Sequence, residues 1–257
     1  MAELERVLRA TRDSGRKILI PYLMGGMSSD WGQSLAAVVG AGADAVEVGI
    51  PFSDPMMDGP VIQEAALASL GRGTVPARVL DDLARTEVGV PLAVMTYYNL
   101  VFRAGHRRMA RSMADVGVSG AIIADLSLEE IAPWATEADG AGVDTVMLVA
   151  PSSPEHRVEA ICARARGFVY AVARMGVTGE QSDLGADAKA VVERIRRYSD
   201  LPVCVGVGVS TPDQAKEVCE VADGVVVGSA LVRRLLADGG PEAAAEFVGS
   251  LRSAIDS

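Results

Sequence analysis

Residues 44–60 read Asp44-Ala-Val-Glu-Val-Gly-Ile-Pro-Phe-Ser-Asp-Pro-Met-Met-Asp-Gly-Pro60. The first part, Asp44–Ile50, has the apolar, β-branched composition of a buried strand. It breaks at Pro51 into a loop that is rich in proline and acidic residues. The stretch therefore predicts a buried strand that ends in a polar loop, which is the repeating unit of parallel α/β folds.

Seven further apolar runs recur along the chain, separated by stretches with helical periodicity. The eight predicted strands are Lys17–Leu23, Asp44–Ile50, Pro91–Tyr97, Gly120–Leu126, Asp144–Ala150, Phe168–Ala173, Pro202–Val207 and Gly224–Val227. Several follow a short segment such as Gly40-Ala-Gly-Ala-Asp44, typical of a helix C-terminus and a tight connection to the next strand.

Buried strands that alternate with amphipathic helices indicate a parallel sheet covered on its outer side. Eight such units in 257 residues, with no linker between them, predict an α/β fold: a single (β/α)8 TIM barrel forming one domain over residues 1–257. Extra helices are predicted at the N-terminus, Glu3–Arg12, and after strand two, Val61–Leu70 and Pro76–Thr86. The alternative is an open doubly wound sheet, but no Gly-x-Gly-x-x-Gly motif follows the first strand.

Composition narrows the possible functions. The net charge is −10 and no run of basic residues occurs, which argues against a nucleic-acid partner. No stretch approaches the ~18–20 apolar residues of a membrane span, and the N-terminus lacks the pattern of a signal peptide. Cys162, Cys204 and Cys219 have no metal-binding spacing, so we expect buried thiols in a reducing compartment and a cytoplasmic protein.

Histidine chemistry is excluded by the sequence context of the two histidines. His106 and His156 stand in charged segments at expected helix starts, so both are predicted to lie on the surface. This argues against serine-hydrolase triads, cysteine–histidine nucleophiles and histidine-based zinc sites. No metal site is expected.

Two carboxylates lie near the end of the second predicted strand. Glu47 lies within the apolar strand, and Asp58 follows eleven residues later in the loop. Burying an isolated carboxylate costs several kcal/mol, so Glu47 must face a wet cavity or become neutral. Different surroundings should give the two groups different pKa values, as acid and base roles require. A buried ion pair between Glu47 and a structural Arg or Lys is the alternative.

Glycines at the ends of the last two strands suggest a phosphate site. Gly206-x-Gly208 precedes one helix start at Ser210-Thr-Pro, and Gly228-Ser229 precedes another. Glycine lets the backbone approach an anion, and the free N–H groups of a helix start attract it. Barrel enzymes frequently bind phosphate with the loops after strands seven and eight. Plain tight turns are the alternative.

The segment 176–182 has the glycine-hinged, polar composition of a lid over the mouth of the barrel, or of an ordinary mobile loop. Together with the carboxylates and the phosphate site, it favours proton-transfer chemistry on a small phosphorylated substrate, such as isomerisation, aldol cleavage or dehydration.

Seven motifs occur in an order that resembles the tryptophan synthase alpha-subunit family, over about Leu4 to Leu235. They are Ile20-Pro-Tyr-Leu23, Glu47-Val-Gly-Ile-Pro-Phe-Ser-Asp-Pro55 with Asp58-Gly-Pro60, Tyr97-Tyr-Asn-Leu-Val-Phe102, Ile122-Ile-Ala-Asp-Leu126, Arg174-Met-Gly-Val-Thr-Gly179, Gly206-Val-Gly-Val-Ser210 and Val227-Gly-Ser-Ala230. The resemblance implies a carbon–carbon lyase of tryptophan biosynthesis. This lyase cleaves indole-3-glycerol phosphate by a retro-aldol reaction to indole and glyceraldehyde 3-phosphate.

The resemblance also implies roles for particular residues. Glu47 would manage the protons at indole C3 and at the side-chain hydroxyl, and Asp58 would hold the indole N–H. Tyr170 and Thr178 would help to order the closed site. The phosphate would be held by four residues, Gly179, Gly208, Gly228 and Ser229.

A partner is implied in the same way. The family forms an α2β2 heterotetramer with a beta subunit, and Asp54 with its loop would face that partner. No cofactor is expected in this chain, and pyridoxal phosphate is expected on the beta subunit.

Four positions depart from the usual family pattern. Met24-Gly-Gly-Met-Ser28 lacks an acidic residue and a proline, Ser127 replaces a proline, Met57 a small residue, and Val207 often a phenylalanine. Two alternatives to the synthase subunit follow. One is a stand-alone lyase that releases free indole, and the other is a non-catalytic activator of a beta subunit.

Overall fold

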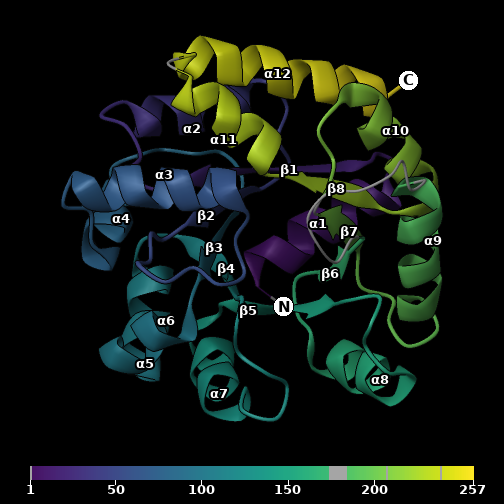
Figure 1. Ribbon diagram of the computed structural model, residues 1–257. Helices are drawn as coiled ribbons and strands as arrows, with labels where there is room; N and C mark the ends of the chain where they lie inside the picture. Colours follow the sequence, from purple (N-terminus) through teal and green to yellow (C-terminus); the bar gives the residue numbers. More distant parts are fainter. Residues whose placement is uncertain (1, 174–183, 207, 238) are drawn as a thin grey trace.

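Eight parallel strands pair in chain order and close into a barrel, with β8 hydrogen-bonded to β1 (Figure 1). The computed structural model describes residues 2–173, 184–206, 208–237 and 239–257. The strands are β1 Ile18–Met24, β2 Val46–Gly49, β3 Leu92–Thr96, β4 Val118–Ile123, β5 Asp144–Val149, β6 Val169–Val172, β7 Val203–Gly206 and β8 Gly224–Val227. The predicted TIM barrel is confirmed.

Helices surround the barrel on its outer side. They are α1 Glu3–Asp13, α2 Trp31–Gly40, α3 Pro60–Gly71, α4 Pro76–Leu83, α5 Tyr98–Ala104, α6 His106–Asp115, α7 Ala132–Ala141, α8 Glu155–Arg164, α9 Leu184–Ile195, α10 Pro212–Val221, α11 Ser229–Leu236 and α12 Gly240–Ile255. The three extra helices predicted before β1 and after β2 are present as α1, α3 and α4. In the described part of the chain, no helix is long and apolar enough to cross a membrane.

Most predicted strand boundaries differ from the structure by one or two residues, and the fourth strand, predicted over Gly120–Leu126 and found over Val118–Ile123, differs most. The fourth strand was expected to begin at Gly120, with the preceding residues as its turn, but β4 begins at Val118 and the turn is made by Gly117 at φ 80°. Gly120 instead lies inside the strand, where a Cβ atom would come within 2.3 Å of Leu4 in α1. The glycine therefore allows a close approach, a role that a sequence pattern does not separate from a turn.

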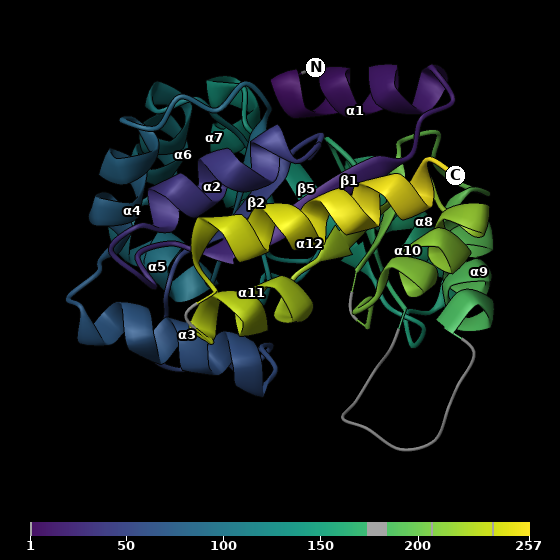
Figure 2. The ribbon, with the colours of Figure 1, turned by 90° about the horizontal axis from the view of Figure 1, so that it is seen from above.

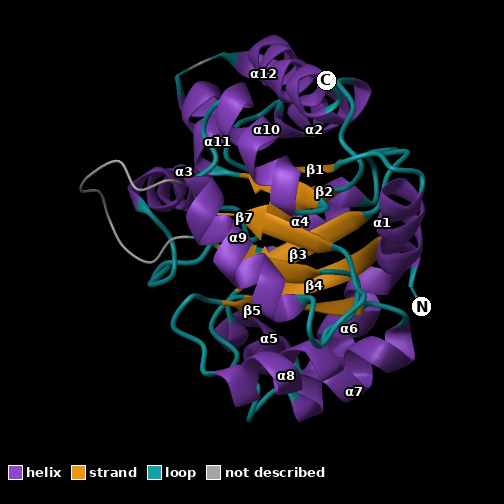
Figure 3. Cartoon of the chain, turned by 90° about the vertical axis from the view of Figure 1, so that its right-hand side faces the viewer, coloured by secondary structure: helices purple, strands orange, loops and turns teal. Residues whose placement is uncertain are grey.

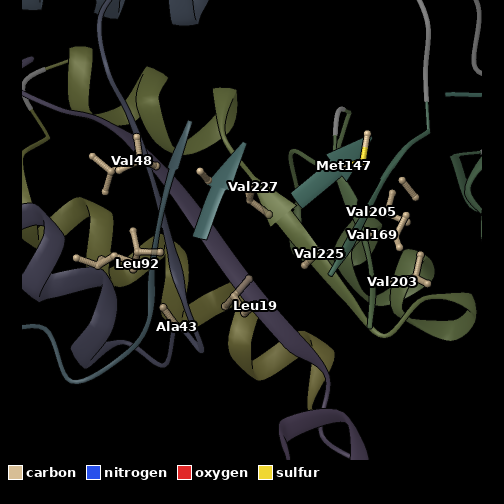
Figure 4. Close-up of a cluster of buried hydrophobic side chains, with 14 of the residues drawn as sticks. Leu19, Ala43, Val48, Leu92, Met147, Val169, Val203, Val205, Val225 and Val227 are labelled. Atoms are coloured by element: carbon tan, nitrogen blue, oxygen red, sulfur yellow. The ribbon is translucent and has the colours of Figure 1, made fainter. Parts of the chain in front are cut away.

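Alternation along the strands decides which side chains face the barrel interior. Outward residues such as Leu19, Val48 and Val225 belong to the large apolar cluster between the strands and the helices (Figure 4). Inward residues such as Ile20 and Ala45 belong to a separate cluster inside the barrel. Glu47 lies between the outward Val46 and Val48, so its side chain points inward.

The two ends of the barrel are covered differently. Leu4 and Leu8 of α1 join the interior cluster and close the end at which the strands begin. Helix α1 lies on one side of the strands in Figure 3, and α3 lies on the other, where the strands end. The second end therefore remains available for a site, as in other barrels of this kind.

Aspartates at strand starts tie distant segments together. Asp44 accepts a hydrogen bond from the Leu19 N–H (2.9 Å) and pairs with Arg252 of α12 (3.0 Å). Asp144 accepts the Glu5 N–H of α1 at 3.0 Å. The Arg252 pair holds α12 against the barrel beside α2 (Figure 2). The aspartate that recurs before the strands therefore accepts hydrogen bonds from backbone N–H groups of distant segments.

Candidate active site

A cavity of about 310 Å³ opens at the carboxyl ends of the strands. Its size falls within the roughly 300–1,000 Å³ that is common for ligand pockets. The lining residues come from both ends of the chain: Tyr22, Glu47, Met57, Asp58, Gly59, Ile62, Met95, Tyr170, Gly208, Val209, Ser210, Val226, Gly228 and Ser229. Six of the predicted site residues that the structure describes therefore meet in one place: Glu47, Asp58, Tyr170, Gly208, Gly228 and Ser229.

Glu47 is held at the base of this cavity. Its side chain is 1% exposed, and Oε2 has no hydrogen-bond partner among the described residues. Burial first, and then the nearby charge of Asp58, raises the pKa of Glu47 to about 8. The alternative of a structural ion pair is not what the structure shows, because no described Lys or Arg pairs with this carboxyl. Glu47 is thus a neutral acid at pH 7.

Asp58 reaches the same cavity from the loop after β2. Burial raises its pKa to about 6, and a hydrogen bond from the Tyr97 hydroxyl lowers it. The same hydroxyl accepts the Met57 N–H at 3.0 Å, and the Tyr97 ring stacks on Phe52 with centroids 5.1 Å apart. Tyr97 therefore holds the loop at both ends and fixes the direction of the Asp58 carboxyl.

Backbone groups form the other end of the cavity. Gly208 lines the cavity with its backbone and has φ 103°, a conformation that only glycine adopts readily. Ser229 is the first residue of α11 and Gly228 is its N-cap, so the free N–H groups of this helix start face the same region. Ser210 and Val209 complete the wall. Such a surface suits an anion such as phosphate.

Other predicted residues lie elsewhere or outside the described part of the chain. Asp54 is exposed and accepts a hydrogen bond from Ser53, and it does not line the cavity. Thr178, Gly179 and the predicted lid at 176–182 lie outside the described residues. Asp125, a polar residue after the fourth strand, accepts the Tyr98 N–H at 2.7 Å and so supports the start of α5 rather than the cavity.

One of the two histidines is not a simple surface residue. His156 is exposed as expected, but His106 is half-buried, and its Nε2 lies 3.0 Å from the Tyr98 hydroxyl. The two rings also stack. The prediction that both lie on the surface was wrong for His106, because the ring supplied by α5 covers it. Neither histidine lines the cavity.

Several cavity residues were not assigned a role from the sequence. Tyr22 lines the cavity, and Tyr97 holds Met57 and Asp58 from behind it. Both stand in motifs that the sequence singled out, and their positions at strand ends were the available signal. Met95, Ile62 and Val226 carry no such signal, because an apolar residue in a strand or helix looks alike whether it faces a core or a ligand.

The arrangement pairs two carboxyl groups with different proton affinities at one end and an anion cradle at the other. At neutral pH, Glu47 can donate a proton and Asp58 is ionised. This is the pattern expected for acid–base catalysis on a phosphorylated substrate. Among the described residues, no group of three His, Cys, Asp or Glu side chains is arranged as metal ligands.

Comparisons with known proteins agree on one family. The profile described as Tryptophan synthase alpha chain matches residues 8–251. The chain is 45% identical to the tryptophan synthase alpha chain of Halorhodospira halophila, over 100% of this chain and 97% of that protein. It is 45% identical to that of Streptomyces coelicolor, over 91% and 88%. A solved structure of Mycobacterium tuberculosis tryptophan synthase is similar at a TM-score of 0.91, with 38% identity, 99% of this chain and 98% of the other covered.

Proposed function

The chain belongs to the tryptophan synthase alpha chain family, and we propose that its cavity cleaves indole-3-glycerol phosphate with Glu47 and Asp58 as the two catalytic carboxylates. The products are indole and glyceraldehyde 3-phosphate. The observation that carries the assignment is the buried carboxyl of Glu47, whose Oε2 has no hydrogen-bond partner among the described residues and which shares one cavity with Asp58, Gly208 and Gly228.

In the proposed reaction the substrate lies with its indole ring between the carboxylates and its phosphate at the glycine end. Neutral Glu47 donates its proton to indole C3, which breaks the aromaticity of the ring and places positive charge on the ring nitrogen. The ionised Asp58 accepts a hydrogen bond from the indole N–H and stabilises that charge. Burial makes this interaction stronger than it would be in water.

Cleavage then needs a base for the hydroxyl on the carbon attached to the ring. Glu47, now a carboxylate, removes this proton, and the electron pair of the O–H bond forms the aldehyde. The carbon–carbon bond breaks, and its electrons restore the aromatic indole. One proton leaves Glu47 and one returns, so the enzyme is unchanged at the end of the cycle.

The phosphate is proposed to bind Gly208, Gly228 and the N–H and hydroxyl of Ser229, with Gly179 added from the segment that the structure does not describe. Tyr170 also lines the cavity, and its hydroxyl lies where a side chain at Gly206 would be. It would complete the wall around the substrate with Thr178.

A beta subunit is the proposed partner, in an α2β2 assembly. The loop that carries Asp58 also carries the exposed Asp54 and Met56, which is 81% exposed, and Phe102 on α5 is 63% exposed. Large exposed apolar side chains often mark a protein interface. Pyridoxal phosphate would belong to the beta subunit, and this chain would carry no cofactor.

We also propose one domain over residues 1–257 and a cytoplasmic location. The contacts of α1 with the barrel interior and of α12 with α2 support a single folding unit. Cys162, Cys204 and Cys219 are all buried and free, which suits a reducing compartment.

The pH dependence of kcat/KM should follow the two carboxyl groups. Asp58 must be ionised, so activity should rise as the pH passes about 6, and Glu47 must be protonated, so activity should fall as the pH passes about 8. Because the two carboxyl groups interact, the two apparent pKa values of the profile belong to the pair in the free enzyme and not to one residue each. The measurement is kcat/KM for indole-3-glycerol phosphate from about pH 5 to pH 9.5. Activity that continues to rise above about pH 8.5 would contradict the role of Glu47 as the initial acid.

Phosphate binding should depend on backbone shape more than on the serine hydroxyl. Gly208→Val should weaken binding of glycerol 3-phosphate at least tenfold, because φ 103° is strained for valine and its side chain would project toward the ligand. Ser229→Ala should weaken it about fivefold, or ~1 kcal/mol, the value of one hydrogen bond. Gly142→Val is the control, because Gly142 has a similar φ of 76° far from the cavity. Calorimetric titration of glycerol 3-phosphate measures all three variants. Equal affinities for wild type and Gly208→Val would place the phosphate elsewhere.

The function itself is tested by incubating the purified chain with indole-3-glycerol phosphate, with and without a tryptophan synthase beta subunit. Slow release of indole and glyceraldehyde 3-phosphate alone, accelerated by the beta subunit, is the expected result. Full activity without acceleration would indicate a stand-alone lyase. Activation of the beta subunit with no cleavage would indicate a non-catalytic activator.

A further inference from the structure

Tyr22 stands in the cavity without a role in the reaction described above. It lies on β1 directly opposite Glu47 of β2 in the pairing of the two strands. Its side chain is 5% exposed and lines the cavity together with both carboxylates. A polar group in this position must interact with whatever occupies the cavity.

The ring of Tyr22 runs along the cavity from the phosphate end to the carboxylate end. A Cβ atom built on Gly228 would lie 3.6 Å from Tyr22 Cβ, so the side chain starts beside the phosphate cradle. A Cβ atom built on Gly49 would lie 2.0 Å from the Tyr22 hydroxyl oxygen. The hydroxyl therefore occupies the space of a residue 49 side chain, the next inward position after Glu47 along β2. This places it between Glu47 and the loop that carries Asp58.

The Tyr22 hydroxyl lacks a good acceptor among the described residues. Its one hydrogen bond there is a 3.9 Å contact to Met24 Sδ, and a thioether is a weak acceptor. By contrast, the Tyr97 hydroxyl is fully used by the Met57 N–H and the Asp58 carboxylate. A buried hydroxyl without a strong partner is costly, so a ligand oxygen at this point would be favoured.

The hydroxyl also remains protonated. Burial first, and then the charges of Asp58 and Glu47, raise the pKa of Tyr22 well above its ordinary value. The phenol can therefore act as a neutral donor over the whole working pH range, and it cannot replace either carboxylate as a base.

We propose that the Tyr22 hydroxyl donates a hydrogen bond to the substrate hydroxyl on the carbon attached to the indole ring, the oxygen that becomes the aldehyde. This inference rests on the proposed function and adds a specificity-determining group to it. The glycerol part of the substrate must pass along the Tyr22 ring, because it connects the phosphate end to the carboxylates. Negative charge grows on that oxygen as Glu47 takes its proton, so the hydrogen bond strengthens toward the transition state.

The test compares wild type with Tyr22→Phe on two ligands. One is indole-3-glycerol phosphate, and the other is indole-3-propanol phosphate, which has hydrogen in place of both side-chain hydroxyls. Tyr22→Phe should lower kcat/KM for the substrate about tenfold or more, with the larger part in kcat, while the Kd of the propanol phosphate should stay within twofold. The unchanged Kd also shows that the variant cavity is intact.

Tyr98→Phe is the matched control, because its hydroxyl faces His106 and lies outside the cavity, and both its constants should be unchanged. Equal losses for both ligands in Tyr22→Phe, or no loss for either, would overturn the inference. If Tyr22→Phe instead shifted the alkaline limb of the kcat/KM profile, Tyr22 would act on Glu47 rather than on the substrate, which would also overturn the inference. Failure of the wild type to cleave the substrate at all would instead refute the proposed function.

Discussion

Glu47→Gln should reduce cleavage of indole-3-glycerol phosphate by about 10³-fold or more. Glutamine keeps the shape of the side chain but can neither give a proton to indole C3 nor take one from the substrate hydroxyl. Loss of general acid–base catalysis costs about 10²–10⁴-fold, and here one group performs both transfers. The measurement is the rate of indole release by the purified chain. Retention of a tenth of the wild-type rate would exclude Glu47 from the chemistry.

Folding of the Glu47→Gln variant gives an independent check on the same residue. Because burial raises the pKa of Glu47 from 4.5 to about 8 in the folded protein, its ionisation opposes folding. The wild type should therefore lose unfolding free energy as the pH rises through this interval, by at most ~1.4 kcal/mol for each pH unit. Glutamine has no such charge, so the advantage of the variant in unfolding free energy should grow between pH 4.5 and about pH 8 and then level off. Glu64→Gln, on the exposed side of α3, is the control and should change neither activity nor this trend.

Asp58→Asn should lower kcat for cleavage by about 10²-fold, with a smaller change in apparent substrate affinity. A neutral amide cannot stabilise the positive charge that develops on the indole nitrogen, and this charge is present mainly in the transition state. Asparagine can still receive the Tyr97 hydroxyl hydrogen bond through its carbonyl oxygen, so the loop should keep its position. Steady-state kinetics with the substrate separate kcat from KM.

The control for Asp58→Asn is Asp54→Asn in the same loop. Asp54 is exposed and outside the cavity, so cleavage by the isolated chain should be unchanged, whereas acceleration by a beta subunit should decrease. If Asp58→Asn raised KM and left kcat intact, Asp58 would serve only to bind the substrate. If both variants behaved alike, the separation of catalytic and partner-facing acids within this loop would be refuted.

The positions of Glu47 and of the glycines at the strand ends can be predicted from local sequence, because residues within a few positions determine where a strand runs and which side each residue faces. The composition of Asp44–Ile50 predicts a strand, which the structure has over Val46–Gly49, and its alternation alone makes Glu47 face the side opposite to Val46 and Val48. The glycines after β7 and β8 likewise predict an anion site from their position before helix starts, and Gly208 and Gly228 both line the cavity.

The exceptions show where such reasoning ends. Gly120 was predicted to begin the fourth strand but lies inside it, because a sequence records the absence of a side chain and not the reason for it, here the packing of Leu4 from α1. His106 resembled a surface residue because the ring that covers it is Tyr98, on the preceding helix.

The order of amino acids specifies the eight strands, the barrel that they close and the two acids that the second strand and its loop present. These features depend on periodicity and on neighbours within a few residues. Three others are visible only in the folded chain: Glu47 Oε2 finds no hydrogen-bond partner among the described residues, Tyr97 directs Asp58, and the Tyr22 hydroxyl lies over Gly49. They arise between the neighbouring strands β1, β2 and β3, because the register of strand pairing sets the distances between side chains that the sequence alone leaves free.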